Sequence, residues 1–407
     1  GSISLPQTGI DQTNVITGGI SAEYGDFVGG AISITTPPPS SKFRMSAEVV
    51  TSSLFDRYHY NLGEFSLTGP IITKNKRTDK ERTILGYFVA ANFNYNADGS
   101  PSAIGINKLN DQKLKELEEN PIRSAPIGTG YVPSASFIYA SDIEKVQARL
   151  NTASYSVSSV FNLNYAPNDQ VNVVFGGTYN YFNGRNYSYT ASLFNYEANG
   201  QSIQHSLLTY LTLTQQLVKP VDPNSEEAKK RTITNAFYSV SLQYQSLWGL
   251  TQDAVHKDNI FDYGYVGRFT TYRAPVYQQV AKEQFDQPDS FNYNGNVYYL
   301  KNYRRLVGYQ DTSYTFDRST TRNPIRSNYT SRYYEFLDGE IDNYGQVRGS
   351  NAGLVNGQNP LGIYSNMWTN VGTQIAGYGK SQTEQYSINA VGQVSIKGHD
   401  IRFGLYY

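Results

Sequence analysis

Long stretches of the chain alternate between apolar and polar residues with a period of two. In residues 85–95 the odd positions hold Leu, Tyr, Val, Ala, Phe and Tyr, and the even positions hold Gly, Phe, Ala and Asn. The same pattern recurs in residues 155–165, 171–181, 238–248, 386–396 and 401–407. Because successive side chains of a strand point to opposite faces, the alternation predicts long strands with one apolar and one polar face. The pattern therefore indicates an all-β fold.

The length of these strands and the make-up of their polar face bear on which kind of β protein this is. The expected strands are longer than about 5–6 residues, which is the usual length in globular proteins. Their polar face holds small uncharged residues, mainly Gly, Ser, Asn, Gln and Thr. Such a face suits the lumen of a membrane barrel, which is wet and faces other protein. Both observations favour a barrel over a soluble sandwich or jelly roll.

Aromatic residues mark the two ends of the apolar face. Tyr155 and Tyr165 are ten residues apart, and so are Tyr238 and Trp248. Ten strand residues tilted by about 40° span roughly 25 Å, the height of the apolar band between the two aromatic girdles of outer-membrane barrels. We therefore expect a transmembrane antiparallel β-barrel in a bacterial outer membrane. The candidate membrane-interface aromatics are Tyr87, Tyr95, Tyr155, Tyr165, Tyr179, Tyr238 and Trp248.

The alternating segments and the turn residues between them predict nine strands. In chain order these cover residues 42–52, 60–71, 82–96, 150–166, 170–188, 203–218, 231–248, 384–396 and a stretch that starts at Ile401. Nine strands leave the first and the last running in the same direction, whereas barrels of this class have an even number. We therefore expect a partial barrel whose remaining strands follow Tyr407.

The predicted connections alternate between short and long, as they do in outer-membrane barrels. Two excursions, residues 97–149 and 249–383, are very long, and both fall outside the cell if the first strand runs outward. The first contains a predicted helix over residues 110–120, with Asn110 or Asp111 as N-cap and Pro121 beyond its end. This helix is short and highly charged, so we expect it on a surface loop. The second excursion is expected to form short hairpins of its own.

The segment before the first predicted strand has a distinct order of residues. Residues 15–36 form a short strand, a glycine-rich turn and an alternating strand that Pro37 ends. The glycines permit positive φ angles and close backbone approach, so an ordinary hairpin is the simplest interpretation. The order resembles the end of the plug domain of TonB-dependent receptors, in particular the Bacteroidota receptors with a carboxypeptidase-regulatory-like N-terminal extension. The matching turn residues are Gly18, Gly19, Ser21, Ala22, Tyr24, Gly25, Gly29 and Gly30, followed by Ile32, Ile34 and Thr35.

This resemblance implies a domain organisation and a function. Residues 1–39 would be the C-terminal end of the plug, and residues 40–407 the N-terminal part of a barrel of about 22 strands. The family imports a scarce ligand actively, and the TonB complex remodels the plug through a segment that this chain lacks. Outer-membrane lipid would surround the barrel, and a surface lipoprotein or other outer-membrane subunits are further implied partners. The ligand, whether siderophore, glycan, peptide or vitamin, stays open.

Two other functions fit the same barrel. A structural subunit of a larger outer-membrane assembly would use the long loops to hold other proteins, and the length of residues 249–383 keeps this alternative open. A passive porin would have an open lumen. Ligand-dependent growth that requires TonB supports transport, whereas co-purification at fixed stoichiometry without an uptake phenotype supports the assembly.

Composition excludes several other classes of function. The 407 residues include 34 Lys and Arg against 34 Asp and Glu, so no net charge attracts nucleic acid. Cysteine is absent, which rules out disulfides, thiolate metal sites and cysteine nucleophiles. No run of about 18 apolar residues predicts a transmembrane helix. The four histidines (His59, His205, His256 and His399) show no metal-ligand spacing, and His59 and His399 are expected to be solvated.

Motifs that would carry catalysis are missing as well. The chain has no Gly-x-Ser-x-Gly motif, and its Gly-Gly pairs belong to neither a dinucleotide fingerprint nor a phosphate-binding loop. The acidic pairs Glu118–Glu119 and Glu226–Glu227 lie in polar runs and are interpreted as solvated faces. Arg304–Arg305 and Lys229–Arg231 are basic and are interpreted in the same way, with lipopolysaccharide phosphate as an alternative contact. We therefore expect neither an enzyme nor a cofactor.

Overall fold

The computed structural model describes residues 5–16, 31–74, 82–127, 131–218, 231–336, 367–396 and 399–407. Its largest element is a nine-stranded antiparallel sheet, which confirms the expected all-β fold. In chain order the strands are β3 (Arg44–Thr51), β4 (Asn61–Lys74), β5 (Arg82–Asn96), β10 (Ser154–Asn168), β11 (Val171–Arg185), β12 (Gln201–Val218), β13 (Ile233–Gln252), β18 (Gly379–Ile396) and β19 (His399–Tyr406).

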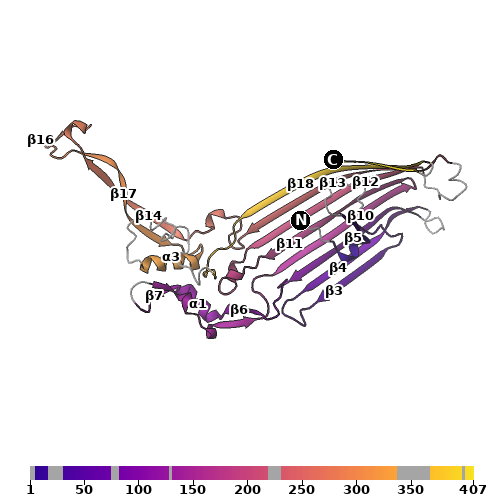
Figure 1. Cartoon of the computed structure of the whole chain (residues 1–407), viewed down its shortest axis with the longest axis horizontal. Helices are drawn as coiled ribbons and strands as arrows, with labels where there is room; N and C mark the ends of the chain where they lie inside the picture. The colour runs from indigo at the N-terminus through magenta and orange to yellow at the C-terminus, as the bar shows by residue number, and fades with distance from the viewer. Residues whose placement is uncertain are drawn as a thin grey trace.

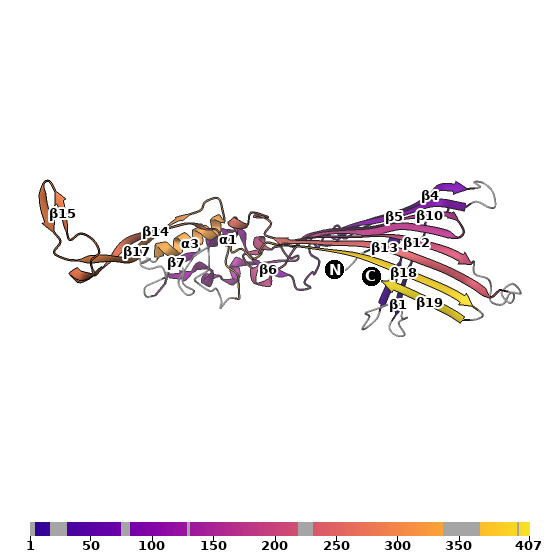
Figure 2. The ribbon, with the colours of Figure 1, turned by 90° about the horizontal axis from the view of Figure 1, so that it is seen from above.

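The sheet is an antiparallel meander, in which each strand pairs with the sheet strands that precede and follow it (Figure 1). The spatial order is β19-β18-β13-β12-β11-β10-β5-β4-β3. Because β3 and β19 are the two edges, the described residues form an open sheet. Figure 2 shows that the strands converge at the end next to the loops and spread apart at the other end, as twisted strands do.

The strand register separates the sheet into an apolar and a polar face. Residues directly opposite each other share a face, so one row of the sheet can be followed from strand to strand. One such row across β10, β11, β12, β13 and β18 is Leu163, Phe175, Leu211, Leu242 and Ile388, all exposed. The neighbouring row on the other face is Asn162, Gly176, Tyr210, Gln243 and Ser387. The alternation in the sequence therefore corresponds to two real faces.

The connections at the two ends of the sheet differ greatly in length. At one end, residues 169–170 alone join β10 to β11. At the other end, residues 97–153, 186–200 and 253–378 join successive strands and extend beyond the sheet (Figure 1). The second long excursion is shorter than expected because Gly249–Gln252 still pair with β12.

The loops at this end contain regular structure of their own. Helix α1 (Asp111–Glu119) lies beside α3 (Pro324–Phe336). The small strands are β6 (Ile106–Leu109), β7 (Ile122–Ser124), β8 (Tyr131–Pro133) and β9 (Ile143–Val146), paired as β6–β9 and β7–β8. Short 3-10 helices lie at Gln7–Gly9, Ser134–Phe137, Ala140–Asp142, Tyr189–Ala191, Tyr196–Ala198, Ile260–Asp262 and Lys282–Gln284.

The expected helix is present, but its surroundings differ from the prediction. The side-chain oxygen of Asn110 accepts a hydrogen bond of 2.8 Å from the backbone N–H of Lys113, so Asn110 is the N-cap. The helix is not an isolated surface element, because Leu117 is only 1% exposed. Leu117 packs in a cluster with Phe194 and Val371, which come from the other two long connections. The three loops therefore form one packed unit, which the charge of the helix did not indicate.

A long hairpin leaves this unit and extends away from the sheet. Its two strands are β14 (Gly267–Gln279) and β17 (Arg304–Arg318), and a second hairpin of β15 (Ser290–Tyr293) and β16 (Asn296–Tyr299) forms its tip (Figure 1). We call residues 267–318 the arm. Its base is fixed because Phe269 and Phe316 contact Tyr334 of α3. The arm confirms that the second excursion forms hairpins.

Over the described part of the chain, every helix is too short or too polar to cross a membrane.

Candidate functional site

The first described residues of the chain lie against the polar face of the sheet. The buried carboxylate of Glu64 in β4 accepts hydrogen bonds from the backbone N–H groups of Gln7 and Thr8, at 3.1 and 2.7 Å. Glu48 lies opposite Glu64 in the register of β3 and β4 but is exposed. One carboxylate therefore holds two adjacent backbone donors, and charge-assisted hydrogen bonds of this kind are stronger than neutral ones.

Apolar contacts beside these hydrogen bonds hold the same segment. Leu5 packs on a small cluster of Phe88, Ala90 and Val160, which are buried on the otherwise polar face. A side-chain carbon at Gly9 would lie 2.7 Å from Val160, so only glycine allows this approach. The apolar exceptions on the polar face are therefore used to pack the N-terminal segment.

The plug-like motif in the sequence lies mostly outside the described residues. The strands on either side of it are β1 (Gln12–Ile16) and β2 (Ala31–Thr35), and they pair antiparallel to each other. The motif residues between them, for which the structure gives no account, are Gly18, Gly19, Ser21, Ala22, Tyr24, Gly25, Gly29 and Gly30.

Aromatic side chains form a continuous row across the apolar face near the loop end of the sheet. The ring centroids of Tyr155 and Tyr181 are 5.8 Å apart, and those of Tyr181 and His205 are 4.9 Å apart. His205 in turn lies 5.0 Å from Trp248, edge to face, and the ammonium of Lys380 lies 5.9 Å from the Trp248 ring. We call these residues the aromatic row; it crosses five strands.

The predicted interface aromatics fall at both ends of the apolar face. Near the aromatic row, Tyr95 lies opposite Tyr155, and the Tyr179 hydroxyl is 2.9 Å from Nδ1 of His205. The members toward the short-turn end are Tyr87, Tyr165 and Tyr238. The pattern of the sequence did not single out Tyr181 and His205 for this row. Both residues occupy odd positions of their strands, β11 and β12, and these positions belong to the apolar face. This was the signal in the sequence that could have assigned them to the row.

A buried ion pair fixes the base of the first long loop. The guanidinium of Arg149 lies 2.9 Å from a carboxylate oxygen of Asp98, whose side chain is fully buried. The backbone N–H of Arg149 donates to the other oxygen at 2.8 Å. Both groups are paired and hydrogen-bonded, as buried charges require. The pair joins the start of the loop, just after β5, to a residue near its end, five positions before β10 begins. Nothing in the sequence marked this pair.

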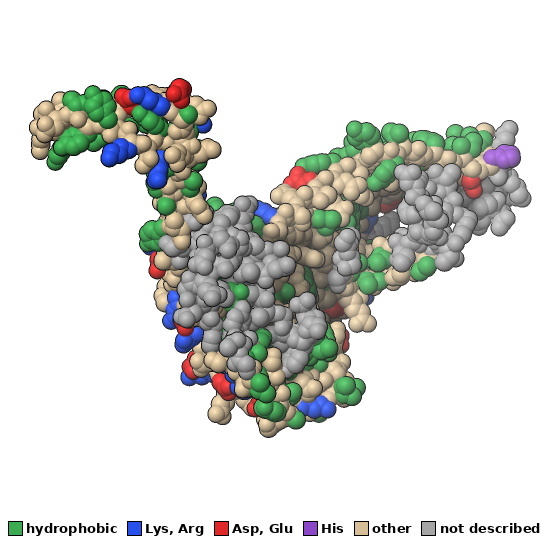
Figure 3. All heavy atoms as spheres, turned by 60° about the vertical axis from the view of Figure 1, so that its left-hand side comes forward, with side chains coloured by type: hydrophobic (Ala, Val, Ile, Leu, Met, Phe, Trp, Pro, Cys, Tyr) green, Lys and Arg blue, Asp and Glu red, His purple; other side chains and the backbone are tan. Residues whose placement is uncertain are grey.

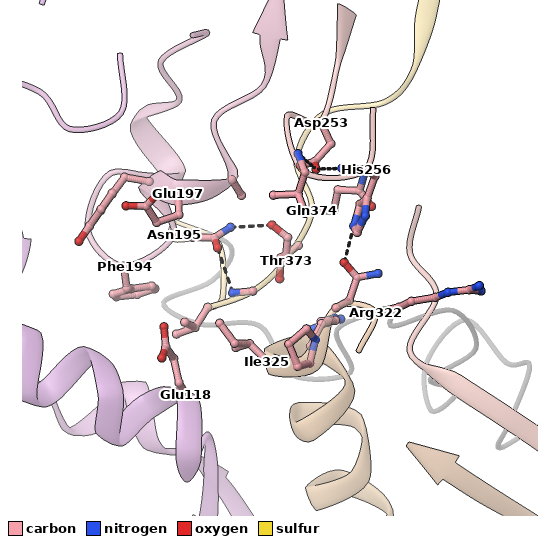
Figure 4. Close-up of a pocket in the computed structure, with 18 of the residues that line it drawn as sticks. Glu118, Phe194, Asn195, Glu197, Asp253, His256, Arg322, Ile325, Thr373 and Gln374 are labelled. Atoms are coloured by element: carbon pink, nitrogen blue, oxygen red, sulfur yellow. Dashed lines mark hydrogen bonds between the residues drawn. The ribbon is translucent and has the colours of Figure 1, made fainter. Parts of the chain in front are cut away.

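The loop unit contains a cleft with a volume of about 400 Å³ (Figure 4). Its lining comes from α1, the loop after β11, the loop after β13, the start of α3 and the segment before β18. We call this the loop cleft. The apolar part of its lining includes Leu114, Phe194, Val255, Ile325 and Val371.

Most polar groups of the loop cleft are already paired with protein. Arg322 forms an ion pair of 3.1 Å with Asp262. The Asp253 carboxylate accepts hydrogen bonds from two backbone N–H groups, at 2.9 and 3.0 Å. Nε2 of His256 lies 2.6 Å from the side-chain oxygen of Asn323. These contacts fix the shape of the cleft and leave few charges for a ligand.

Asn195 ties the loop after β11 to the segment before β18. Its side-chain N–H donates to the carbonyl of Thr373 at 2.7 Å, and its oxygen accepts from the backbone N–H of Gly372 at 3.0 Å (Figure 4). Gly372 has a φ of +73°, which glycine adopts without strain. A side-chain carbon there would also lie 2.7 Å from Ile325. This wall of the cleft therefore depends on a glycine.

Two further groups are buried in α3, namely Arg326, which lines the cleft, and Tyr329 beside it. The Arg326 side chain lies over the Tyr329 ring at 5.0 Å, and the two residues are 4% and 2% exposed. Burial lowers the pKa of Arg326 to about 10 and raises the pKa of Tyr329 to about 12. Arg326 therefore stays cationic at neutral pH but faces the interior of the loop unit.

The described residues contain no group of His, Cys, Asp and Glu side chains arranged to hold a metal ion. His59 and His399 are exposed, as expected, and His399 is the first residue of β19. His205 belongs to the aromatic row, and His256 is 9% exposed in the loop cleft.

No protein-family model matches the chain, and neither the curated proteins nor the solved structures contain a match.

Proposed function

We propose that the protein is a plugged β-barrel transporter of the bacterial outer membrane, which imports a scarce ligand with energy from the TonB complex. One observation carries this proposal: the apolar face of the sheet is exposed, and the N-terminal segment is bound to the opposite, polar face. An exposed apolar sheet face has to be covered, and a segment on the inner face closes the lumen. The plug-like order of residues between β1 and β2 supports the same assignment.

Lipid is the covering that best fits the apolar face. The row from Leu163 to Ile388 is 37–46% exposed in every strand that it crosses. Figure 3 shows hydrophobic side chains gathered along the sheet and on the arm. Contiguous apolar patches beyond about 300–600 Å² are rare on soluble monomers. The aromatic row then lies at one membrane interface, because Tyr, Trp and Lys suit a boundary between apolar and aqueous surroundings.

The polar face argues for a plugged transporter over a passive porin. Glu64 and the cluster around Val160 bind the N-terminal segment on the part of this face formed by β4, β5 and β10, where an open pore would hold water. The long loops are packed into one unit with a cleft, which can hold a ligand above the plug. Import requires both a capture site and a removable plug, and this arrangement supplies a candidate for each.

The two tryptophans provide a direct test of the membrane boundary. Trp248 belongs to the aromatic row, whereas Trp368 packs against Tyr189 and Phe194 in the loop unit. In Trp368→Phe protein, we expect lipids brominated near the headgroup to quench the remaining Trp248 strongly. In Trp248→Phe protein, the same lipids should leave the remaining Trp368 unaffected, and aqueous acrylamide should quench it instead. The measurement is steady-state fluorescence of protein in bilayers.

Equal quenching of the two single-tryptophan proteins by brominated lipid would contradict the proposed membrane face. Loss of the folded state is excluded by comparing the far-ultraviolet circular dichroism of both variants with that of the parent protein.

A structural role in an outer-membrane assembly is the second candidate, and the arm favours it. Its tip carries exposed aromatic residues, and isolated two-stranded hairpins are only marginally stable in water. Phe291 stacks on Tyr298 at 5.5 Å, and both rings remain exposed. Tyr, Asn, Ser and Gly dominate residues 290–299, a composition that binding loops of antibodies also use. A protein bound at the tip would cover these rings.

Replacing Phe291, Tyr298 and Tyr299 together with serine separates the two roles. For an assembly subunit, we expect a partner that co-purifies at fixed stoichiometry to be lost, because truncated aromatic anchors commonly cost about 2 kcal/mol or more each. TonB-dependent uptake should then be unaffected. Phe261→Ser is the matched control, since Phe261 is 85% exposed outside the arm. Loss of uptake without loss of a partner would instead place the tip in transport.

A further inference from the structure

Two carboxylates of the loop cleft, Glu118 and Glu197, have no ion pair with the described residues, and Glu118 is the more buried of the two. Glu118 projects from α1 toward the loop that carries Phe194 (Figure 4). Its side chain is half-buried, and burial together with the neighbouring Glu119 raises the pKa of Glu118. Among the described residues, no cationic side chain forms an ion pair with it. The attraction of Lys115 lowers the pKa of Glu118 less than burial raises it. A half-buried carboxylate without an ion-pair partner is costly, and a cationic group from outside would relieve that cost.

The apolar lining lies directly beside this carboxylate. Leu114 belongs to the same helix one turn earlier, and Phe194, Ile325 and Val371 complete the wall. Phe194 is 2% exposed and is held by Trp368, so its ring is fixed before a ligand arrives. A volume of about 400 Å³ lies within the range of small-molecule sites. The cleft therefore places the Glu118 carboxylate next to a rigid apolar surface.

The basic groups of the cleft are not available to bind an anionic ligand. Arg322 is neutralised by Asp262 at 3.1 Å, and Arg326 is buried over Tyr329. Glu197, a further exposed carboxylate, lines the same cleft. The charge that the cleft presents to a ligand is therefore negative.

We propose that the loop cleft binds a ligand with an apolar body and one ammonium or guanidinium group, and that this cation lies at Glu118. The apolar body then fills the space lined by Phe194, Ile325 and Val371. This inference rests on the proposed import function, for which the cleft is the outer capture site. A peptide with an aromatic residue next to arginine or lysine has the required chemistry.

Two peptides that differ only in charge test this assignment. N-acetyl-phenylalanyl-arginine amide has a single positive charge, and its citrulline analogue has nearly the same shape without it. Titration calorimetry with the purified protein in detergent is expected to give at least about 10-fold tighter binding of the arginine peptide, as one charge-assisted hydrogen bond supplies. Glu118→Gln should remove this difference, because the amide keeps the size of the side chain and loses its charge.

Glu116→Gln is the matched control on the same helix. Glu116 is exposed and contacts Lys113 at 3.1 Å, outside the cleft. This variant should retain the preference for the arginine peptide. Equal affinity for both peptides, no binding of either, or the same loss in Glu116→Gln and Glu118→Gln would each overturn the assignment. Ile325→Asp, which places a charge in the apolar wall, should weaken the binding of both peptides.

Binding and import can fail separately in this design. The calorimetry needs no TonB, so it tests the cleft alone. Binding of the arginine peptide without TonB-dependent uptake would refute the import function and leave the cation site in place. TonB-dependent growth on another ligand, with no peptide binding, would support the import function and refute the cation site.

Discussion

Arginine in place of Leu242 is expected to destabilise the protein in a bilayer by about 2–4 kcal/mol, whereas arginine in place of Gln243 should cost far less. Leu242 is 46% exposed on the apolar face and lies midway along β13, and charged residues near the mid-depth of a lipid-facing surface carry that cost. Gln243 is the next residue of β13, on the polar face, where an arginine can reach water or polar groups. The two substitutions add the same charge at the same depth.

The fraction of folded protein in the outer membrane of producing cells measures this difference. Folded barrels resist unfolding in cold detergent and migrate differently from heated samples on gels, so each variant can be scored without purification. A similar folded fraction for Leu242→Arg and Gln243→Arg would show that lipid does not cover the apolar face, and the membrane assignment would then fail.

Replacing Glu64 by leucine is expected to release the N-terminal segment from the sheet. The carboxylate holds the N–H groups of Gln7 and Thr8, and charge-assisted hydrogen bonds contribute about 1.5–3 kcal/mol each. Loss of about 3 kcal/mol raises the population of the open state roughly 100-fold. Amide hydrogen exchange of Gln7 and Thr8 should therefore become faster by about that factor in the Glu64→Leu protein.

Glu48→Leu is the control for this measurement, because Glu48 faces the same side of the sheet and no hydrogen bond joins it to the segment among the described residues. In the Glu48→Leu protein, the amides of Gln7 and Thr8 should exchange at the same rate as in the parent protein. Glu64→Gln should give an intermediate rate, because the two N–H groups bond to different carboxylate oxygens and the amide keeps only one of these acceptors, without the charge. Unchanged exchange in Glu64→Leu would mean that the apolar contacts of Leu5 alone retain the segment.

Much of the sheet could be predicted because its signal is local. An alternation such as that of residues 155–165 is read from neighbouring positions, and each strand then pairs with the next. The expected bounds of β5 agree with the structure. Strand ends are harder to predict, as β13 shows, because its pairing with β12 continues through Gly249–Gln252, beyond Trp248 where the alternating pattern ends.

The loop unit could not be predicted, because its contacts join distant parts of the chain. Leu117 and Leu114 show a helical spacing, but nothing near them indicates that Phe194 and Val371 form their partners. The same holds for the candidate sites. The charge of Glu118 appears in the sequence as part of a polar run, and only the fold places it beside an apolar wall.

The separation between local and distant contacts also sets an order of assembly. Each strand of the meander can join the growing sheet as soon as its neighbour is in place. The hydrogen bond from Asn195 to Thr373, in contrast, connects residues 178 positions apart, and such contacts form only after a long stretch of chain has been brought together. The contacts between the loops therefore form only after the segment before β18 has reached the sheet. We expect the loop cleft to form last, so that during folding the protein passes through a stage in which the sheet is complete and the cleft is not.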